Sequence, residues 1–347
     1  MKLDRNEAFA RIRLLRSPNI GPVSYRQLLR RFGDAAGALA ALPDLAGRGG
    51  APYRAAPERR VEEEISRVKR AGARYLFHDS PEYPALLGQV GASPPILIVR
   101  GDAALARNAS AAAVKLSRSF ATALVEAGFA VVSGLARGID GAAHQSALSC
   151  GATVGVIASG IDITYPPEHA ELQERVATEG PPGTEPLARH FPSRNRIIAG
   201  LAAGTLVVEA APRSGSLITA RLAGEYDRKV MAIPGPPLDS RAHGCSQLIR
   251  DGAVLVQTPD DVVELLSAFD GAPRSSFREA MPSYAAIDDV QAEEPAEIAG
   301  LLTPAPVAVD ELIRQSGESA AAVQFALLEL EIAGLVRHAG NRVSLGV

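Results

Sequence analysis

The chain has 347 residues, of which 47% are hydrophobic and 22% charged, so it can form two or three domains with a sizeable core. Its formal net charge of −3 does not attract a polyanion in bulk, and any nucleic-acid site must depend on local patches. Cys150 and Cys245 are far apart and lack zinc spacing, which favours a reducing cytoplasm. We find no export signal and no apolar run of about eighteen residues, so we expect no membrane contact.

The N-terminal residues predict a small helical domain, 1–72. Asp4 followed by Glu7 predicts a capping box at the start of a first helix. A second helix follows "PNIGPVS" and ends at Gly33. Positions 1–40 hold eight basic side chains against three acidic ones. The turn resembles a helix-hairpin-helix, whose backbone amides approach DNA phosphate, although Asn19 stands where a glycine is usual; a solvated basic face is the alternative.

The segment 73–268 predicts an α/β domain. Short apolar strands such as "FAVVSG" and "TVGVIASG" alternate with helices, and continuous apolar strands imply a parallel sheet covered by helices on both faces. The polar segment 269–295 predicts a linker. In 296–347, two helical patterns followed by "VRHAGNRVSLGV" predict a winged helix. Its second helix offers no basic side chain, so we expect it to contact protein rather than DNA.

Three loops after strands are the candidate binding loops, because ligands of open parallel sheets bind beyond the carboxyl ends of the strands. They are "SGLARGIDG", "FPSRNRIIAGL" and "EAAPRSGSLITA". Each combines helix-terminal amides with arginines, which suits phosphate oxygens. We expect the "FPSRNR" arginines to precede a helix start, where Phe191 can stack on a base of single-stranded DNA. Packing of Phe191 and pairing of the arginines with carboxylates is the alternative.

Catalytic and cofactor motifs are missing from the sequence. There is no P-loop, no dinucleotide fingerprint, no nucleophile elbow and no metal-spaced cluster. We therefore predict no catalytic residue, no metal and no cofactor. His144, His169 and His190 are isolated, and we expect structural or surface roles for them.

The ordered motifs "SGLARGIDGAAHQSAL", "YPPEH", "FPSRNRIIAGL", "SGSLITARLA" and "GCSQLIRDGA" resemble those of the DNA-processing protein A family (DprA, also called Smf). The resemblance covers the whole chain. It implies an extended Rossmann-like core between an N-terminal sterile-alpha-motif-like helical domain and a C-terminal winged helix. It also implies a homodimer that binds single-stranded DNA and helps load RecA recombinase during natural transformation. The DNA-binding residues it implies are Arg107, Arg137, Gly138, Phe191, Arg194, Asn195, Arg196, Ser214, Gly215 and Ser216.

Two segments depart from the family pattern. The family has an apolar strand before its first arginine, yet "GDAALARNAS" reads as having none, and "ATEGPPGTEP" lacks the strand expected before its threonine. A sheet without two central strands would expose hydrogen-bonding edges. We therefore predict that residues are missing from the chain near Leu105/Ala106 and Gly180/Pro181.

Two other functions compete with a single-stranded DNA binder. A Rossmann-like enzyme acting on a nucleotide or phosphoribosyl compound would use "PPGTEP", but Glu185 has no evident partner. A transcription regulator would use the winged helix, whose second helix is acidic. We expect the chain to be no enzyme.

Overall fold

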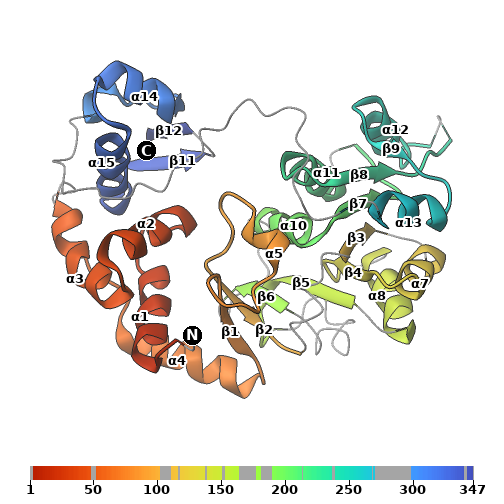
Figure 1. The fold of residues 1–347 in the computed structure, drawn as a ribbon, viewed down its shortest axis with the longest axis horizontal. Helices are drawn as coiled ribbons and strands as arrows, with labels where there is room; N and C mark the ends of the chain where they lie inside the picture. Colours follow the sequence, from red (N-terminus) through yellow and green to blue (C-terminus); the bar gives the residue numbers. More distant parts are fainter. Residues whose placement is uncertain are drawn as a thin grey trace. The chain divides into compact units, whose positions relative to one another are not determined.

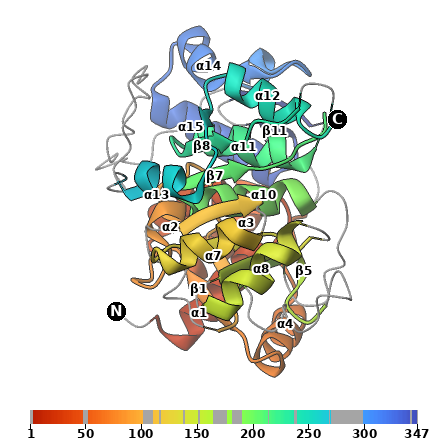
Figure 2. The same cartoon turned by 90° about the vertical axis from the view of Figure 1, so that its right-hand side faces the viewer.

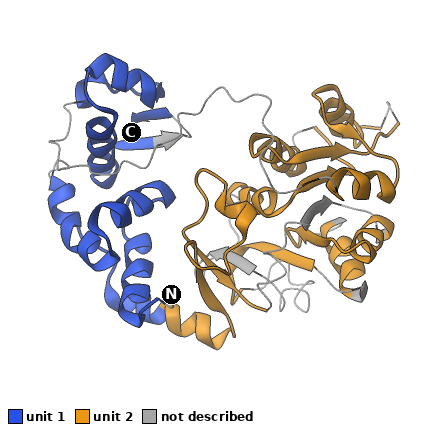
Figure 3. Ribbon diagram, in the orientation of Figure 1, with its two compact units in different colours: residues 1–63, 277–347 blue, residues 64–276 orange. Residues whose placement is uncertain are grey.

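The structure, a computed structural model, describes residues 3–47, 52–101, 111–115, 118–136, 139–150, 153–163, 177–180, 190–212, 214–236, 239–267, 269, 298–339 and 342–346. The chain forms two compact units (Figures 1 and 3). Unit 1 joins Met1–Glu63 to Phe277–Val347, and unit 2 is Glu64–Ser276. The predicted linker lies outside the described residues except at position 269.

Three helices make the N-terminal part of unit 1: α1 (Arg5–Arg16), α2 (Pro22–Phe32) and α3 (Ala35–Leu45). The Asp4 carboxylate caps α1 by accepting a hydrogen bond from the Asn6 amide at 3.3 Å. The predicted capping box is wrong, because the Glu7 carboxylate accepts from the Ala35 amide at 3.1 Å and so caps α3 instead. A contact between helices therefore replaces the local one.

The C-terminal part of unit 1 is the predicted winged helix. It contains η3 (Ala299–Leu301), β10 (Val307–Ala308), α14 (Val309–Ser316), α15 (Ala320–Ile332), β11 (Val336–Ala339) and β12 (Arg342–Leu345). The strands form an antiparallel sheet with β12 in the middle.

Helix α15 has two apolar faces. Leu327 and Leu330 pack into the core of the winged helix. Leu328 and Ile332 are buried in the core of the N-terminal helices, with Phe325 packed beside them. The protein contact expected for this helix is therefore made within the chain, and α15 joins the two segments of unit 1.

Unit 2 is built on a nine-stranded sheet. Its strands are β1 (Arg74–Phe77), β2 (Ile96–Val99), β3 (Ala111–Lys115), β4 (Ala130–Ser133), β5 (Thr153–Gly160), β6 (Ala177–Gly180), β7 (Gly204–Val207), β8 (Lys229–Ala232) and β9 (Val254–Leu255). Their order is β1-β2-β6-β5-β4-β3-β7-β8-β9. The run from β6 to β9 is parallel, as predicted, but β1 and β2 add an antiparallel edge.

Helices cover both faces of this sheet. The described helices are α4 (Glu58–Arg70), α5 (Ala85–Gly88), α7 (Arg118–Glu126), α8 (Ile139–Cys150), α10 (His190–Leu201), α11 (Gly215–Glu225), α12 (His243–Arg250) and α13 (Pro259–Ser267). Helices α7, α8 and α13 share a core with Val131 of β4, and α7 lies beside α8 (Figure 2). On the other face α10 packs against Val132 and β5, while α11 and α12 cover β7 and β8.

The interpretation that "ATEGPPGTEP" contains no strand is wrong, because β6 forms at Ala177–Gly180, and the other central place in the sheet is held by β3, which follows "GDAALARNAS" in the chain. Strand β3 pairs in parallel with both β4 and β7, and β6 pairs with β5 and β2. The sequence signal was weak because β3 is built mainly from alanine, which is depleted in strands. Strand β6 carries Gly180 and Glu179, which are depleted as well. Leu105, Ala106 and Pro181 lie outside the described residues. The absence of residues at these two points therefore stays a prediction.

Glu331 of α15 lies where the winged helix meets the N-terminal helices. A Cβ on Gly21, the residue before α2, would lie 3.8 Å from its Oε1. Burial raises the pKa of Glu331 to about 7, and a hydrogen bond with Ser24 opposes the shift only in part. Nearby, Arg31 of α2 stacks on Phe325 of α15, with its guanidinium carbon 3.8 Å from the ring centre.

We expect unit 1 to lose stability as the pH rises from about 4.5 to about 7. The folded state holds the Glu331 proton in this range and the unfolded state does not, so the loss is on the order of 2–3 kcal/mol. Glu331→Gln should flatten this part of the profile. Urea unfolding at a series of pH values measures it, and an unchanged slope in the variant would contradict the assignment.

Candidate nucleic-acid interface

The candidate residues gather where helices begin at one edge of the parallel strands. Helix α8 follows β4, α11 follows β7, and α10 packs against α11. Because strands and following helices alternate, the amino ends of these helices share the carboxyl edge of the sheet. None of the described helices is long and apolar enough to cross a membrane.

Helix α10 begins earlier than predicted. It starts at His190, so Phe191, Arg194 and Arg196 lie within its first two turns rather than before it. Arginine is unfavourable near the positive amino end of a helix, so the sequence favoured a later start. Because all three residues lie on one helix, the helical spacing decides which of their side chains are in contact.

Arg194 is a buried cation beneath Phe191. Its side chain is 7% exposed, and its guanidinium carbon lies 5.2 Å from the centre of the half-buried Phe191 ring. Burial lowers the pKa of Arg194, and the nearby Asp140 carboxylate opposes this shift. Its buried Nε has no hydrogen-bond partner among the described residues. The guanidinium therefore supports the ring from inside the protein.

Arg194 reaches this position because residue 134 is glycine. A Cβ there would lie 1.2 Å from Nη1 of Arg194. The next residue, Leu135, is buried and has a φ of 55°, which is strained for a bulky side chain. Asp140, also buried, accepts from the Ala136 amide at 3.3 Å. These contacts tie the loop after β4 to α10.

A hydrogen bond joins the starts of α10 and α11. The Asn195 side chain, buried at the α10 end, donates to the Gly215 carbonyl at 3.4 Å. Ser214 caps α11, and its hydroxyl accepts from the Ser216 amide at 3.3 Å. Ser216 is buried, whereas Gly215 is exposed. The exposed part of this group is therefore the Gly215 backbone with the partly exposed Ser214.

Arg196 points away from this group. Its Nη2 donates to the Ala92 carbonyl at 2.7 Å, and its Nε lies 3.4 Å from the Tyr226 hydroxyl. The predicted residues Arg107, Arg137 and Gly138 lie outside the described residues. The structure thus brings Phe191, Arg194 and Asn195 next to Ser214, Gly215 and Ser216, and it separates Arg196 from them.

Sequence reasoning missed two positioning residues. Gly134 and Asp140 both lie in the candidate loop "SGLARGIDG", but neither was linked to Arg194. No local pattern links Gly134 or Asp140 to Arg194, which lies 60 and 54 positions further along the chain, so only the sheet topology reveals these contacts. His144 matches its expected structural role, because its Nδ1 lies 2.7 Å from the buried Thr153 hydroxyl. Among the described residues no cluster could hold a metal ion.

Models of three protein families match the chain. A model described as DNA recombination-mediator protein A matches residues 74–267, one described as a DprA-like N-terminal HHH domain matches 5–66, and one described as a DprA winged helix domain matches 281–341. The chain belongs to the DNA recombination-mediator protein A family. Membership gives it the role of a DNA-processing recombination mediator.

Similar proteins agree with this membership. Protein Smf of Escherichia coli strain K12 is 34% identical over 302 residues, which cover 81% of this chain and 79% of that protein. The structure of DNA processing protein A from Streptococcus pneumoniae is similar with a TM-score of 0.62 and 32% identity, over 78% of this chain and 99% of that one.

A second solved structure supports the fold alone. DNA processing protein A from Helicobacter pylori was solved to study its single-stranded DNA binding mode. It is similar with a TM-score of 0.50 and 22% identity, over 57% of this chain and 97% of that one.

We expect Gly134→Ala and Arg194→Ala to be coupled. Gly134→Ala alone should lower the free energy of unfolding by about 1–3 kcal/mol, because the new methyl group displaces a buried guanidinium. In the Arg194→Ala background the same change should cost little, since no guanidinium remains to clash. Urea unfolding of the four proteins gives the coupling energy. Additive losses would show that Arg194 does not lie against Gly134.

Proposed function

We propose that the carboxyl edge of the unit 2 sheet binds single-stranded DNA, with Phe191 as the stacking platform for a base. The observation that carries this is the half-buried Phe191 ring supported from below by Arg194. An aromatic ring accepts any base face, but the base must be unpaired to reach it, so single strands are favoured over duplex. The single-stranded DNA binding of the Helicobacter pylori relative adds support.

Phosphate oxygens would lie beside this ring, at the start of α11. The exposed Gly215 and the Ser214 hydroxyl stand at the amino end of that helix, where unpaired amides carry partial positive charge. The proposed surface also includes Arg107, Arg137 and Gly138, as the family resemblance implies. Asn195 and Ser216 hold the two helix ends together. Arg196, which is engaged with Ala92, stabilises the packing of α10.

Arg194 has a different role in this proposal from the one its sequence motif implied. Its burial keeps it from the solvent that surrounds a flexible strand, so it positions Phe191 rather than contacting phosphate. The charge of Asp140 nearby offsets part of the cost of burying it.

The proposal extends to partners and mechanism class. We infer a non-enzymatic mediator that acts in the cytoplasm as a homodimer and helps load RecA recombinase onto the bound strand. The mediator role of the family supports a non-enzymatic mediator. The resemblance of the sequence motifs supports the homodimer, the cytoplasmic location and the loading of RecA.

Phe191→Ala should weaken binding of an oligo-dT strand by roughly 5- to 150-fold, the effect of losing one stacked base. Lys229→Ala is the matched control, because Lys229 is exposed at the opposite, amino edge of the same sheet. Fluorescence anisotropy with a labelled strand measures both. Wild-type affinity in Phe191→Ala would refute the stacking role.

Arg194→Ala should weaken the same binding without changing its dependence on salt. A side chain that positions the ring neutralises no phosphate, so the slope of log K against log salt stays the same, whereas loss of a phosphate contact reduces it by about one. Titrations at several salt concentrations decide between these roles. A smaller slope of log K against log salt in Arg194→Ala would show that Arg194 contacts a phosphate directly.

A further inference from the structure

The loop after β8 folds back over the end of β7. Its described residues are 233–236 and 239–242. The Ala210 amide donates to the Arg241 carbonyl at 2.8 Å, and the Gly244 amide donates to the Ala210 carbonyl at 2.8 Å. A Cβ on Gly244 would lie 2.5 Å from that carbonyl oxygen, so this close approach requires glycine. The loops after β7 and β8 are therefore held together at the carboxyl edge of the sheet.

The loop after β7 connects this contact to the proposed single-strand site. The loop continues from Ala210 to Ser214, whose amide donates to the Ala211 carbonyl at 3.0 Å. Ser214 then caps α11, beside the exposed Gly215. Arg241 is thus attached, through Ala210, to the same loop that offers Ser214 and Gly215 to a phosphate.

Asp239 holds the guanidinium of Arg241 in one orientation. Nη2 of Arg241 donates to Oδ2 of Asp239 at 2.8 Å, and Nε donates to Oδ1 at 3.2 Å. The Arg241 backbone amide donates to the same Oδ1 at 2.9 Å. The side-chain hydrogen bonds between the two groups lower the pKa of Asp239 and raise the pKa of Arg241, so both are charged at neutral pH. Because the pair is bidentate, the plane of the guanidinium is fixed although the Arg241 side chain is 64% exposed.

The remaining side of the guanidinium faces Glu209. Nη1 of Arg241 lies 3.8 Å from Oε1 of Glu209, which is longer than a hydrogen bond. Both side chains are largely exposed, and an ion pair of this kind contributes little to stability. A guanidinium has more N–H donors than one carboxylate can occupy, and Asp239 uses those of Nε and Nη2. Nη1 can therefore exchange Glu209 for another anion while Asp239 stays in place.

We propose that Arg241 binds a phosphate of the single strand whose base stacks on Phe191, with Asp239 as its positioning residue and Glu209 as the anion that the phosphate displaces. The inference rests on the proposed function, since the phosphate belongs to the same strand. Phosphate is the ligand because its oxygens accept charge-assisted hydrogen bonds from an oriented guanidinium. The strand then runs along the carboxyl edge from α10, past the start of α11, to the loop before α12. Glu209 competes for Arg241 and so limits the affinity for DNA.

Arg241→Ala should weaken binding of oligo-dT by about tenfold and reduce the slope of log K against log salt by about one. Arg250→Ala is the matched control, because Arg250 is exposed in the last turn of α12, at the other end of that helix. Phe191→Ala is titrated in parallel. If Phe191→Ala weakens binding and Arg241→Ala does not, this inference fails and the proposed function stands. If neither variant weakens binding, both fail.

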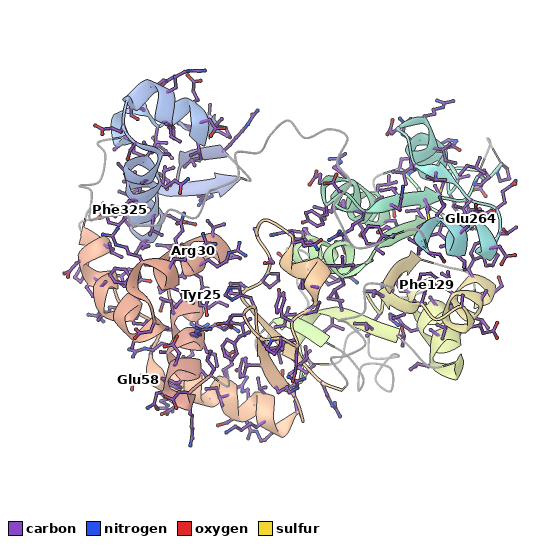
Figure 4. All side chains as sticks on the ribbon, viewed as in Figure 1. Tyr25, Arg30, Glu58, Phe129, Glu264 and Phe325 are labelled. Carbon is purple, nitrogen blue, oxygen red and sulfur yellow. The ribbon has the colours of Figure 1, made fainter. Side chains whose placement is uncertain are left out.

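The two acidic residues should respond in opposite directions. Glu209→Gln should tighten binding roughly two- to fivefold, and this gain should disappear in the Arg241→Ala background. Asp239→Asn also removes a negative charge but should weaken binding, because an amide nitrogen cannot accept from Nη2. Glu264→Gln is the matched control, because Glu264 is exposed on α13, which covers the opposite face of the sheet (Figure 4).

Either of two results in these variants overturns the proposal. A gain in Glu209→Gln that persists without Arg241 would show that Glu209 repels the strand directly rather than competing for the guanidinium. Tighter binding by Asp239→Asn would show that Asp239 also acts only by repulsion and does not position Arg241.

Discussion

The polarity of the parallel strands is the constraint on which unit 2 depends. The strands β6-β5-β4-β3-β7-β8-β9, neighbours in this order in the sheet, all run in the same direction. The helices that follow them in the chain therefore begin at the same edge. This edge collects helix amides that no helix can satisfy internally. Residues from distant positions, Asn195 and Gly215, consequently meet there in one hydrogen bond. The antiparallel β1 and β2 extend the sheet without adding a helix end to this group.

A buried cation is an unusual means of holding an aromatic ring. Burial removes water from the Arg194 guanidinium. A cation–π contact with Phe191 and the charge of Asp140 offset part of this cost. It fits only because Gly134 has no side chain, and the strained Leu135 follows directly. Strain and buried charge near one ring are features that packing alone does not favour. They are consistent with a ring whose orientation matters to a ligand.

Much of the fold was predictable because its strands and helices carry strong apolar patterns. The helices of the winged helix and strands such as β4 and β5 lie where the sequence placed them. Alanine-rich β3 was missed because its stability comes from pairing on both sides rather than from its own propensity. Arg194 and Arg196 could not be told apart from the sequence, since they differ only in the neighbours that the fold gives them. Glu7 was misassigned for the same reason.

Helix α15 shows how one sequence can belong to two cores. Residues on one face, Leu327 and Leu330, specify the winged helix, and residues on the other, Leu328 and Ile332, specify the contact with the N-terminal helices. In a winged helix that reads DNA, the second helix must leave one face free for the groove. Here that face is apolar and acidic, and it is occupied within the chain. The winged helix therefore cannot read DNA through α15 while this face packs on the N-terminal helices.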